Sequence, residues 1–465
     1  MIFDPAEALA PPALRALQQE RWQQLCSRLA GHRFHGPRLA GRADQRDLAS
    51  VPFMRKQDLW DNYPFGLLAV DRSQVRRVHG TSGTKGRPTL ASYAAEDLQL
   101  FGNVNARALA AAGAGPGTMV HNGYGYGLFT GGLGLHGGAE ALGCCVVPIS
   151  GGQTARQVRL IGDLRAQVIC CTPSYAVLLG EAMQASGVSP AENPLQVGIF
   201  GAEPWTEEMR MRIESLHGIT ALDIYGMCEV IGPGVAFECL ETRAELAEGG
   251  AGGMHVNEDH FFVEIVDPTS GDVLDDGQIG EVVFTTLTRV AQPVVRYRTG
   301  DLASLNRQPC ACGRTTVRMS RLAGRSDDML VVRGVNVFPS EIEAAILAMA
   351  ELAPHYTIVL DDRGDMPEMI VACELAGRDV ATSIHDVRAG LVRSLSERLG
   401  VRGTVVVGSP GTIPRSEVGK TVRVVRLDAS SPPLPGELGA LLAGVTAEAS
   451  SATKSGTAAG EGRHS

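Results

Sequence analysis

Short apolar runs that alternate with helical stretches are the feature that most limits the fold of this chain. Three such runs are Val168–Cys171, Val197–Phe200 and Leu222–Tyr225, and the helical stretch EEMRMRIESLHG lies between the second and the third. This rhythm is typical of βαβ units, in which a helix connects two parallel strands of one sheet. The second and third runs are each followed directly by a glycine, and α/β proteins bind ligands in loops at the carboxyl ends of such strands. The pattern therefore predicts an α/β fold with its functional residues in these loops.

The chain has 465 residues, more than one hydrophobic core usually supports, so two domains are expected. From Asp327 onward the pattern becomes a small α+β unit, and Ser340 and Glu343 fit a capping box that begins its first helix. We expect a large N-terminal domain of mostly parallel sheets and helices over 1–323 and a small mobile domain over 324–426. Residues 427–465 are poor in large apolar side chains and are expected to be a flexible tail with one weak helix at GELGALLAGV.

Composition narrows the class of partner. The 51 acidic residues outnumber the 42 Lys and Arg residues, which is the opposite of the basic surface that nucleic-acid binding needs. No apolar stretch reaches the roughly 18 residues of a membrane span, and the N-terminus MIFDPAEALAPP lacks the basic and apolar regions of a signal peptide. We therefore expect a cytoplasmic protein that binds small molecules, with no nucleic-acid or membrane partner.

The segment TSGTKGRPT at 81–89 is the strongest local signal. Its glycines let backbone N–H groups approach an anion, its hydroxyls add donors, and Lys85 and Arg87 supply positive charge, so it suits a polyphosphate. It is not a Walker loop, and alone it would also fit a polar surface turn. The candidate nucleotide contacts in it are Thr81, Ser82, Gly83, Thr84, Lys85 and Gly86.

Five short motifs follow one another along the chain: TSGTKGRP, YGMCE, YRTGD, GRSDD and PRSEVGK. Their order and spacing resemble those of the adenylate-forming superfamily of acyl-CoA synthetases, nonribosomal-peptide adenylation domains and luciferases. Segments such as YGYGLFTGG, ICCTPSYA and YGMCEVIGPGVAFEC look most like phenylacetate-CoA ligases, over about residues 50 to 426. The resemblance implies ATP-dependent activation of an aryl carboxylic acid to an acyl-adenylate, followed by transfer to coenzyme A.

The resemblance also implies a role for individual residues. Glu229 would hold Mg²⁺ against the phosphates, and Asp301 would accept hydrogen bonds from both ribose hydroxyls. Lys420 would stabilise the charge that develops as the carboxylate attacks the α-phosphate. Arg325 would serve both catalysis and nucleotide binding. Asp327 would be the hinge about which the small domain rotates between the two half-reactions.

Two further groups complete the implied site. Small residues and a proline form a loop on which adenine would lie, and the segment after it along the chain adds nucleotide contacts: Gly201, Ala202, Glu203, Pro204, Tyr225, Gly226 and Met227. An aryl pocket would be lined by Tyr124, Phe129, Gly131 and Ala202. Aromatic contacts with an aryl ring are worth about 0.5–1.5 kcal/mol beyond burial. Ordinary core packing is the alternative for each of these aromatic residues.

Cys310 and Cys312 are spaced too closely to define a zinc knuckle by themselves. Cys239 and His255 could complete a Cys₃His set, and some phenylacetate-ligase-like proteins resemble this arrangement with bound zinc. Four protein ligands with no open position would make a structural site. His260 would replace His255 if His255 were wrongly placed, and four reduced, unliganded side chains are the alternative.

Three functions stay open from the sequence. The first is a ligase that converts a phenylacetate- or substituted-benzoate-like acid to aryl-CoA, AMP and pyrophosphate, with ATP, Mg²⁺, coenzyme A and structural Zn²⁺. The second is an enzyme of a biosynthetic pathway, as in secondary metabolism, that loads the acid onto a separate carrier protein or an amine. The third is a non-catalytic nucleotide-binding protein, which the joint presence of Glu229, Asp301 and Lys420 disfavours. A homodimer is one possible assembly.

Overall fold

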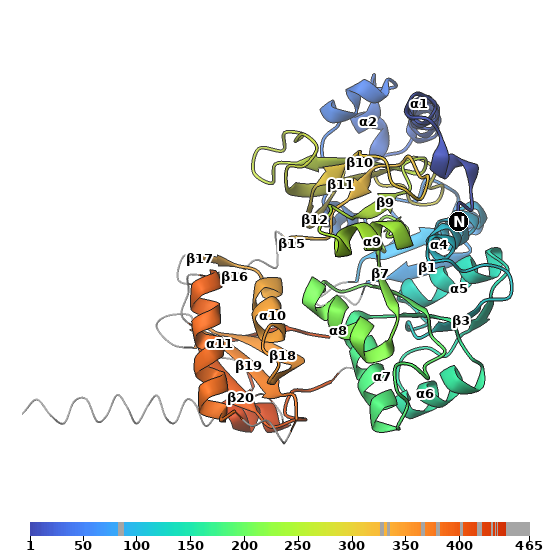
Figure 1. The fold of residues 1–465 in the computed structure, drawn as a ribbon. Helices are drawn as coiled ribbons and strands as arrows, with labels where there is room; N and C mark the ends of the chain where they lie inside the picture. Colours follow the sequence, from blue (N-terminus) through green and yellow to red (C-terminus); the bar gives the residue numbers. More distant parts are fainter. Residues whose placement is uncertain are drawn as a thin grey trace, which may run out of the picture. The chain divides into compact units, whose positions relative to one another are not determined.

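The chain divides into two compact units, which Figure 1 shows in sequence colours. The large unit consists mainly of Met1–Trp205 and Arg210–Asp327, and the small unit mainly of Asp328–Ser416 and Thr421–Ser465. This computed structural model describes residues 1–81, 88–325, 330–332, 335–363, 368–377, 382–399, 403–415, 421–428, 431–432, 434 and 436–442.

A nine-stranded sheet forms the centre of the large unit, in the strand order β13-β14-β9-β8-β7-β6-β5-β3-β4. The strands from β7 to β4 pair in parallel, and the strands from β7 to β13 pair antiparallel. The predicted runs are β5, β6 and the middle of β7, so the α/β class is confirmed. The strands are β3 (Met119–Asn122), β4 (Cys145–Val147), β5 (Val168–Cys171), β6 (Val197–Gly201), β7 (Thr220–Met227), β8 (Gly232–Phe237), β9 (Met254–Val256), β13 (Leu305–Asn306) and β14 (Arg318–Met319).

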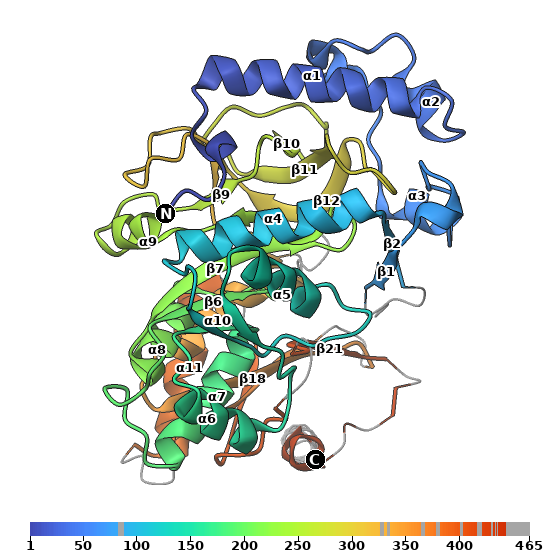
Figure 2. The same cartoon turned by 90° about the vertical axis from the view of Figure 1, so that its right-hand side faces the viewer.

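Helices accompany this sheet in the way that the alternating pattern predicts. Helices α4 and α5 pack against each other and over β8 (Figure 2). Helix α7 begins where the Thr172 hydroxyl accepts a hydrogen bond from the Tyr175 N–H, with Pro173 as its first residue. The helices are α4 (Ala95–Ala111), α5 (Gly131–Ala141), α6 (Thr154–Asp163), α7 (Pro173–Ala185), α8 (Glu207–His217) and α9 (Leu240–Ala247).

A second sheet of the large unit is antiparallel, in the order β10-β11-β12-β15. The N-terminal helix α1 lies along this sheet (Figure 2), where Trp22, Leu25 and Leu29 pack against Leu287 and Val295. A separate hairpin of β1 and β2 carries the TSGTKGRPT segment between its strands. The elements are β10 (Phe261–Val266), β11 (Gly280–Thr286), β12 (Tyr297–Ala303), β15 (Gly324–Arg325), β1 (Arg77–Gly80), β2 (Leu90–Tyr93), α1 (Pro11–Leu29), α2 (His35–Leu39) and α3 (Lys56–Asp61).

The small unit has a four-stranded mixed sheet in the order β20-β19-β18-β21 and a β16–β17 hairpin. Apolar side chains of both helices and the sheet form one core. The elements are β16 (Leu330–Val332), β17 (Val335–Val337), α10 (Pro339–Leu347), β18 (Leu352–Asp361), β19 (Glu368–Leu375), α11 (Ile384–Leu399), β20 (Thr404–Gly408) and β21 (Val424–Leu427).

The capping box predicted at Ser340 and Glu343 is wrong. Helix α10 begins at Pro339, because proline suits the first helical position, and Glu341 accepts the hydrogen bond from the Phe338 N–H at 3.1 Å. Glu343 is instead buried, and its carboxylate accepts a hydrogen bond from Tyr356 Oη at 2.7 Å.

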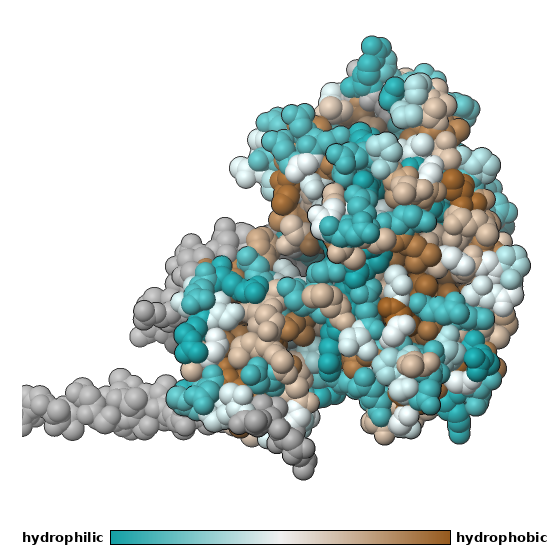
Figure 3. All heavy atoms as spheres, viewed as in Figure 1, coloured by the Kyte–Doolittle hydropathy of each residue, from teal (hydrophilic) through white to brown (hydrophobic). Residues whose placement is uncertain are grey.

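Residues 436–442, within the segment expected to be a tail, form a helix in the small unit. Its Leu438 and Leu442 are buried in a cluster with Val359 and Ile370 of the sheet. None of the helices in the described residues is long and apolar enough to cross a membrane. On the face drawn in Figure 3, hydrophilic residues are mixed with small apolar groups, as on ordinary protein surfaces.

Candidate active site

Asp301 and Arg325 lie opposite each other on the paired strands β12 and β15. The buried Asp301 carboxylate accepts hydrogen bonds from Tyr225 Oη at 2.6 Å and from Arg325 Nη1 at 2.5 Å. Burial raises the pKa of Tyr225, and the negative charge of Asp301 raises it further. The phenol therefore stays protonated and donates a hydrogen bond. Gly226 and Met227 follow Tyr225 on β7. The structure thus brings together three of the predicted nucleotide residues and fixes the carboxylate as an acceptor.

Glu229 follows β7 in a turn that backbone contacts hold in place. The buried Arg289 donates to the carbonyl oxygens of Glu229 at 2.5 Å and Val230 at 2.7 Å, and Tyr93 Oη donates to the carbonyl of Ile231 at 2.7 Å. Glu229 is 7% exposed, and its carboxylate makes no hydrogen bond or ion pair with any described residue. Both oxygens can therefore meet a hard cation such as Mg²⁺.

The first and last residues of the predicted phosphate segment pair with each other at the end of the β1–β2 hairpin. The Thr81 N–H donates to the Thr89 carbonyl at 3.0 Å, and the Thr89 N–H donates to Thr81 Oγ1 at 3.0 Å. Several predicted residues lie outside the described residues: Ser82, Gly83, Thr84, Lys85, Gly86, Asp327 and Lys420.

The residues predicted for the aryl pocket converge. A methyl group placed on Gly131 would lie 2.7 Å from Phe129 Cε1 and 3.2 Å from Tyr124 Cδ1, and Ala202 packs against the same cluster. Tyr124 is buried, and its hydroxyl has no hydrogen-bond partner among the described residues. Burial raises the pKa of Tyr124, so the hydroxyl is neutral. An apolar wall with one polar group is typical of small-molecule sites.

The loop predicted to carry adenine leaves the end of β6 with unusual backbone geometry. A methyl group on Gly201 would lie 2.2 Å from the Ile224 carbonyl oxygen, so only glycine fits there. Ala202 has φ 72, in the left-handed region, and such strain is concentrated at functional sites. The Glu203 carboxylate accepts a hydrogen bond from the Ser174 N–H at 2.7 Å, while Pro204 is exposed.

Cys239, His255, Cys310 and Cys312 form one cluster in the large unit. Their ligand atoms all lie within 4.8 Å of one another, and His255 Nε2 is 3.7 Å from Cys239 Sγ and 3.4 Å from Cys312 Sγ. Cys239 caps α9, His255 lies on β9, and the other two cysteines lie in the turn after β13. Residues 245–253, which lie between Cys239 and His255 in the sequence, contain the end of α9.

Groups around the cluster orient the sulfur atoms and the imidazole. The Thr242 N–H donates to Cys239 Sγ at 3.3 Å, and the Arg314 N–H donates to Cys312 Sγ at 3.4 Å. His255 Nδ1 lies 3.4 Å from Thr316 Oγ1, which leaves Nε2 facing the thiols. Hydrogen bonds from the Cys239 and Cys310 thiols lower the pKa of Cys312. Three sulfurs and one nitrogen with such outer contacts fit a tetrahedral Zn²⁺ ion.

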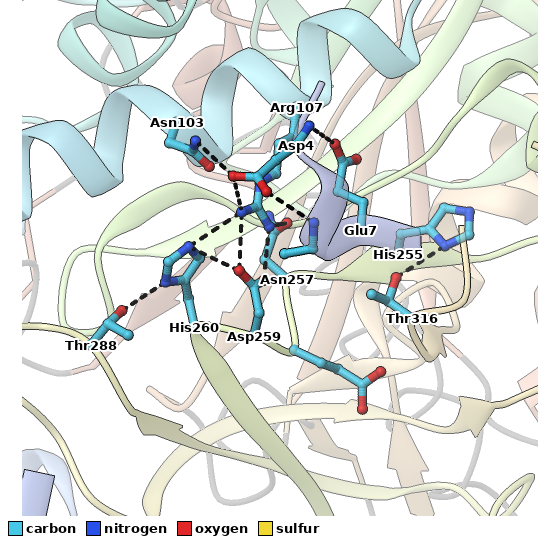
Figure 4. A network of polar contacts seen from close by, with 12 residues as sticks. Asp4, Glu7, Asn103, Arg107, His255, Asn257, Asp259, His260, Thr288 and Thr316 are labelled. Atoms are coloured by element: carbon cyan, nitrogen blue, oxygen red, sulfur yellow. Dashed lines mark hydrogen bonds and ion pairs between the residues drawn. The ribbon is translucent and has the colours of Figure 1, made fainter. Parts of the chain in front are cut away.

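His260 belongs to a different network, which Figure 4 shows beside His255. Its Nδ1 lies 2.8 Å from Thr288 Oγ1, and its Nε2 lies 3.1 Å from Asp259 Oδ2. Asp259 also forms an ion pair with Arg107 at 2.8 Å. Burial lowers the pKa of His260 to about 3. His255, and not its substitute His260, is therefore the histidine placed at the cysteine cluster.

Arg289, Tyr93 and His79, which hold the turns and hairpin of the site, were not found from the sequence. Arg289 and Tyr93 act on backbone carbonyls, a contact that has no sequence motif. His79 lies two positions before Thr81, the first residue of the TSGTKGRPT segment, and this position is its one signal.

Comparisons with known proteins show similarity over most of the chain. The model of the AMP-binding enzyme family matches residues 81–288, and that of the AMP-binding enzyme C-terminal domain matches 334–427. The chain is 47% identical over 92% of its length to a phenylacetate-coenzyme A ligase of Thermus thermophilus, which it covers completely. A phenylacetate-coenzyme A ligase of Escherichia coli strain K12 is 48% identical over 82% of this chain and 85% of its own length.

A solved structure gives the same picture of the fold. The crystal structure of 2-hydroxyisobutyryl-CoA ligase in the postadenylation state, in complex with R3-HIB-AMP, is 27% identical in sequence. It matches 91% of each chain with a TM-score of 0.82.

Proposed function

The chain belongs to the phenylacetate-coenzyme A ligase family of adenylate-forming enzymes, and on that premise we propose that it activates an aryl carboxylic acid with ATP and transfers the acyl group to coenzyme A. The products are aryl-CoA, AMP and pyrophosphate. The observation that carries the proposal is that Tyr225 and Arg325 hold the Asp301 carboxylate, while the nearly buried Glu229 carboxylate has no hydrogen-bond or ion-pair partner among the described residues.

The nucleotide is proposed to bind through complementary groups along this site. Asp301 accepts hydrogen bonds from the ribose diol, because an ionised carboxylate only accepts. Glu229 holds Mg²⁺ against the phosphates, adenine lies on the loop from Gly201 to Pro204, and residues 81–89 bind the phosphates. Arg325 stabilises the Asp301 carboxylate while facing the nucleotide.

The acid is proposed to be phenylacetate or a substituted benzoate. Tyr124, Phe129 and Ala202 supply a wall suited to a flat apolar ring, and offset or edge contacts add about 0.5–1.5 kcal/mol beyond burial. Gly131 supports this assignment, since a Cβ there would clash with Phe129 and crowd Tyr124, so its substitution would move the proposed wall.

Two half-reactions require the site to change between them. Lys420 is proposed to stabilise the charge at the α-phosphate during adenylation, and rotation about Asp327 is proposed to withdraw it before coenzyme A attacks. Both roles rest on the PRSEVGK and GRSDD motifs.

The Cys₃His cluster is proposed to hold a structural zinc ion. With four protein ligands the ion has no open position, so it takes no part in acyl transfer. It would tie the start of α9 to the turn after β13 and so stabilise the antiparallel half of the central sheet.

The alternative acceptor of the acyl group, in place of coenzyme A, is a separate carrier protein or an amine. The exchange reaction before acyl transfer would be the same, so only the acceptor separates the two functions. The cytoplasm is the proposed compartment, and a homodimer is the proposed assembly to test.

Acid-dependent exchange of pyrophosphate into ATP tests the proposal. Phenylacetate and substituted benzoates are expected to support exchange that requires Mg²⁺, and Asp301→Ala to lose about a hundredfold in kcat/KM, as for loss of a charged hydrogen-bond acceptor. Lys420→Ala is expected to lose adenylation while still converting preformed aryl-adenylate to thioester. Absence of exchange with every aryl acid would refute the proposal.

A further inference from the structure

One backbone carbonyl joins two parts of the site. We infer that His79 is a positioning residue that couples the acid-binding loop, defined here as residues 124–131, to the phosphate hairpin, defined as β1 and β2 with Thr81 and Thr89. The inference rests on the proposed function, because it gives those two parts their substrates.

The coupling runs through Leu128. Its carbonyl oxygen accepts a hydrogen bond from the Gly80 N–H at 2.9 Å and lies 3.0 Å from His79 Nδ1. Leu128 directly precedes Phe129 of the aryl wall, and Gly80 directly precedes Thr81 of the phosphate segment. Two donors from β1 therefore hold the acid-binding loop at one atom.

The hydrogen-bond chemistry defines the protonation of His79. A carbonyl oxygen only accepts, so Nδ1 must carry the proton. Burial lowers the pKa of His79, so the imidazole is neutral, and its Nε2 has no partner among the described residues. A phenylalanine would fill the same space without burying an unpaired nitrogen. What histidine adds at this position is the Nδ1–H donor.

The ring of His79 is held rigidly, so the donor has a fixed direction. It is fully buried and meets Tyr93 edge-on at 5.2 Å between ring centroids and Phe101 at 6.5 Å. Tyr93 in turn donates its hydroxyl to the Ile231 carbonyl, next to the turn of Glu229. The packed rings of His79, Tyr93 and Phe101 thus connect the acid-binding loop, the phosphate hairpin and the turn proposed to hold Mg²⁺.

This arrangement matters for the attack of the carboxylate on the α-phosphate. That step needs both groups in register, and small misplacements of bound reactants slow it strongly. If His79 sets the register, its loss should leave each substrate able to bind alone but lower the rate when both are present. The effect should therefore fall on kcat more than on either KM.

Three replacements separate the donor from the ring. The amide nitrogen of Asn occupies the place of Nδ1, that of Gln occupies the place of Nε2, and Phe keeps the ring contacts without a donor. We expect His79→Asn to keep kcat of phenylacetate-dependent exchange within about threefold, and His79→Gln and His79→Phe to lower it about tenfold or more with KM values nearly unchanged.

His217→Phe is the matched control. His217 is also fully buried and its Nε2 lies 2.7 Å from a backbone carbonyl, but that carbonyl belongs to Ala176 on α7 and not to the acid-binding loop. This variant is expected to unfold at a lower temperature but to keep kcat in the folded protein. Thermal unfolding of every variant shows which ones are folded under assay conditions.

The outcomes are distinct. Wild-type-like kcat in a folded His79→Phe or His79→Gln, or an equal loss in His79→Asn and His79→Gln, would overturn the inference. Should His79→Phe fail to fold, the Asn and Gln pair decides alone. Absence of exchange in the wild-type protein with any acid would instead be a failure of the proposed function.

Discussion

Tyr225 Oη donates a hydrogen bond to Asp301 Oδ2 at 2.6 Å across 76 positions of the chain. Tyr225 lies on the central sheet and Asp301 on the second sheet of the large unit. The YGMCE and YRTGD motifs are therefore in direct contact, and a residue of the first orients the carboxylate of the second.

Replacing Tyr225 with Phe removes this hydrogen bond and leaves the ring. Because a hydrogen bond to a charged group contributes about 1.5–3 kcal/mol, KM for ATP should rise about tenfold or more while KM for the acid stays constant. Steady-state kinetics of exchange measure both. Tyr63→Phe, at a residue 41% exposed, should change neither value. An unchanged KM for ATP in Tyr225→Phe would remove Tyr225 from the nucleotide site.

A methyl group at Gly131 should alter acid selection. In Gly131→Ala the new Cβ would lie 2.7 Å from Phe129 Cε1, so the ring proposed to contact the acid would have to move. We expect kcat/KM for phenylacetate to fall about tenfold, since a misfit of one methyl group costs about 1–3 kcal/mol. Gly137→Ala, on the same helix, meets no atom closer than 3.9 Å and should behave as wild type. Equal kinetics for both variants would place the acid elsewhere.

The cysteine cluster should contain zinc in the purified protein. Elemental analysis is expected to give about one zinc ion per chain, and Cys312→Ser to lose most of it and about 5 °C or more of melting temperature. Cys145→Ser replaces an exposed cysteine outside the cluster and should change neither. If the purified wild-type protein contained no stoichiometric zinc, the proposed zinc site would be contradicted, and the four side chains would be reduced and unliganded.

Stability should depend on pH through His260, whose pKa burial lowers to about 3. Between pH 3 and the ordinary histidine pKa of about 6.5, the folded state then binds fewer protons than the unfolded state. The contribution of His260 to the free energy of unfolding is therefore complete above pH 6.5 and is lost as the pH falls through this range. From pH 6.5 to 5 the free energy of unfolding should drop by about 1.5–2 kcal/mol on this account.

Urea unfolding at several pH values measures this slope. His260→Asn should lower the slope by the equivalent of about one proton taken up on unfolding. His385→Asn, at a side chain 83% exposed, should leave the slope unchanged. An identical slope in wild type and His260→Asn would show that His260 does not titrate as its burial requires.

The sequence predicted best what local patterns encode. Apolar runs located β5, β6 and β7, and residue chemistry grouped Cys239, His255, Cys310 and Cys312, although these come from distant segments. Antiparallel strands such as β8 and β9 were missed because their pairing depends on long-range register, which the βαβ rhythm does not reveal.

Contacts to backbone atoms were the least predictable part of the site. His79 and Arg289 act on the carbonyl oxygens of Leu128 and Glu229, and any residue would offer the same oxygen. At Pro339 a local rule was applied at the wrong residue, since proline begins the helix before the serine that seemed to cap it.

Formation of aryl-CoA tests the central claim most directly. Protein incubated with ATP, Mg²⁺, phenylacetate and coenzyme A can be followed by mass spectrometry of the thioester and by quantifying AMP. We expect phenylacetyl-CoA and AMP in equal amounts, with neither formed when the acid is omitted and both formed about a hundredfold more slowly by Asp301→Ala. AMP released with acid but without any thioester, or no acid-dependent AMP at all, would contradict the claim.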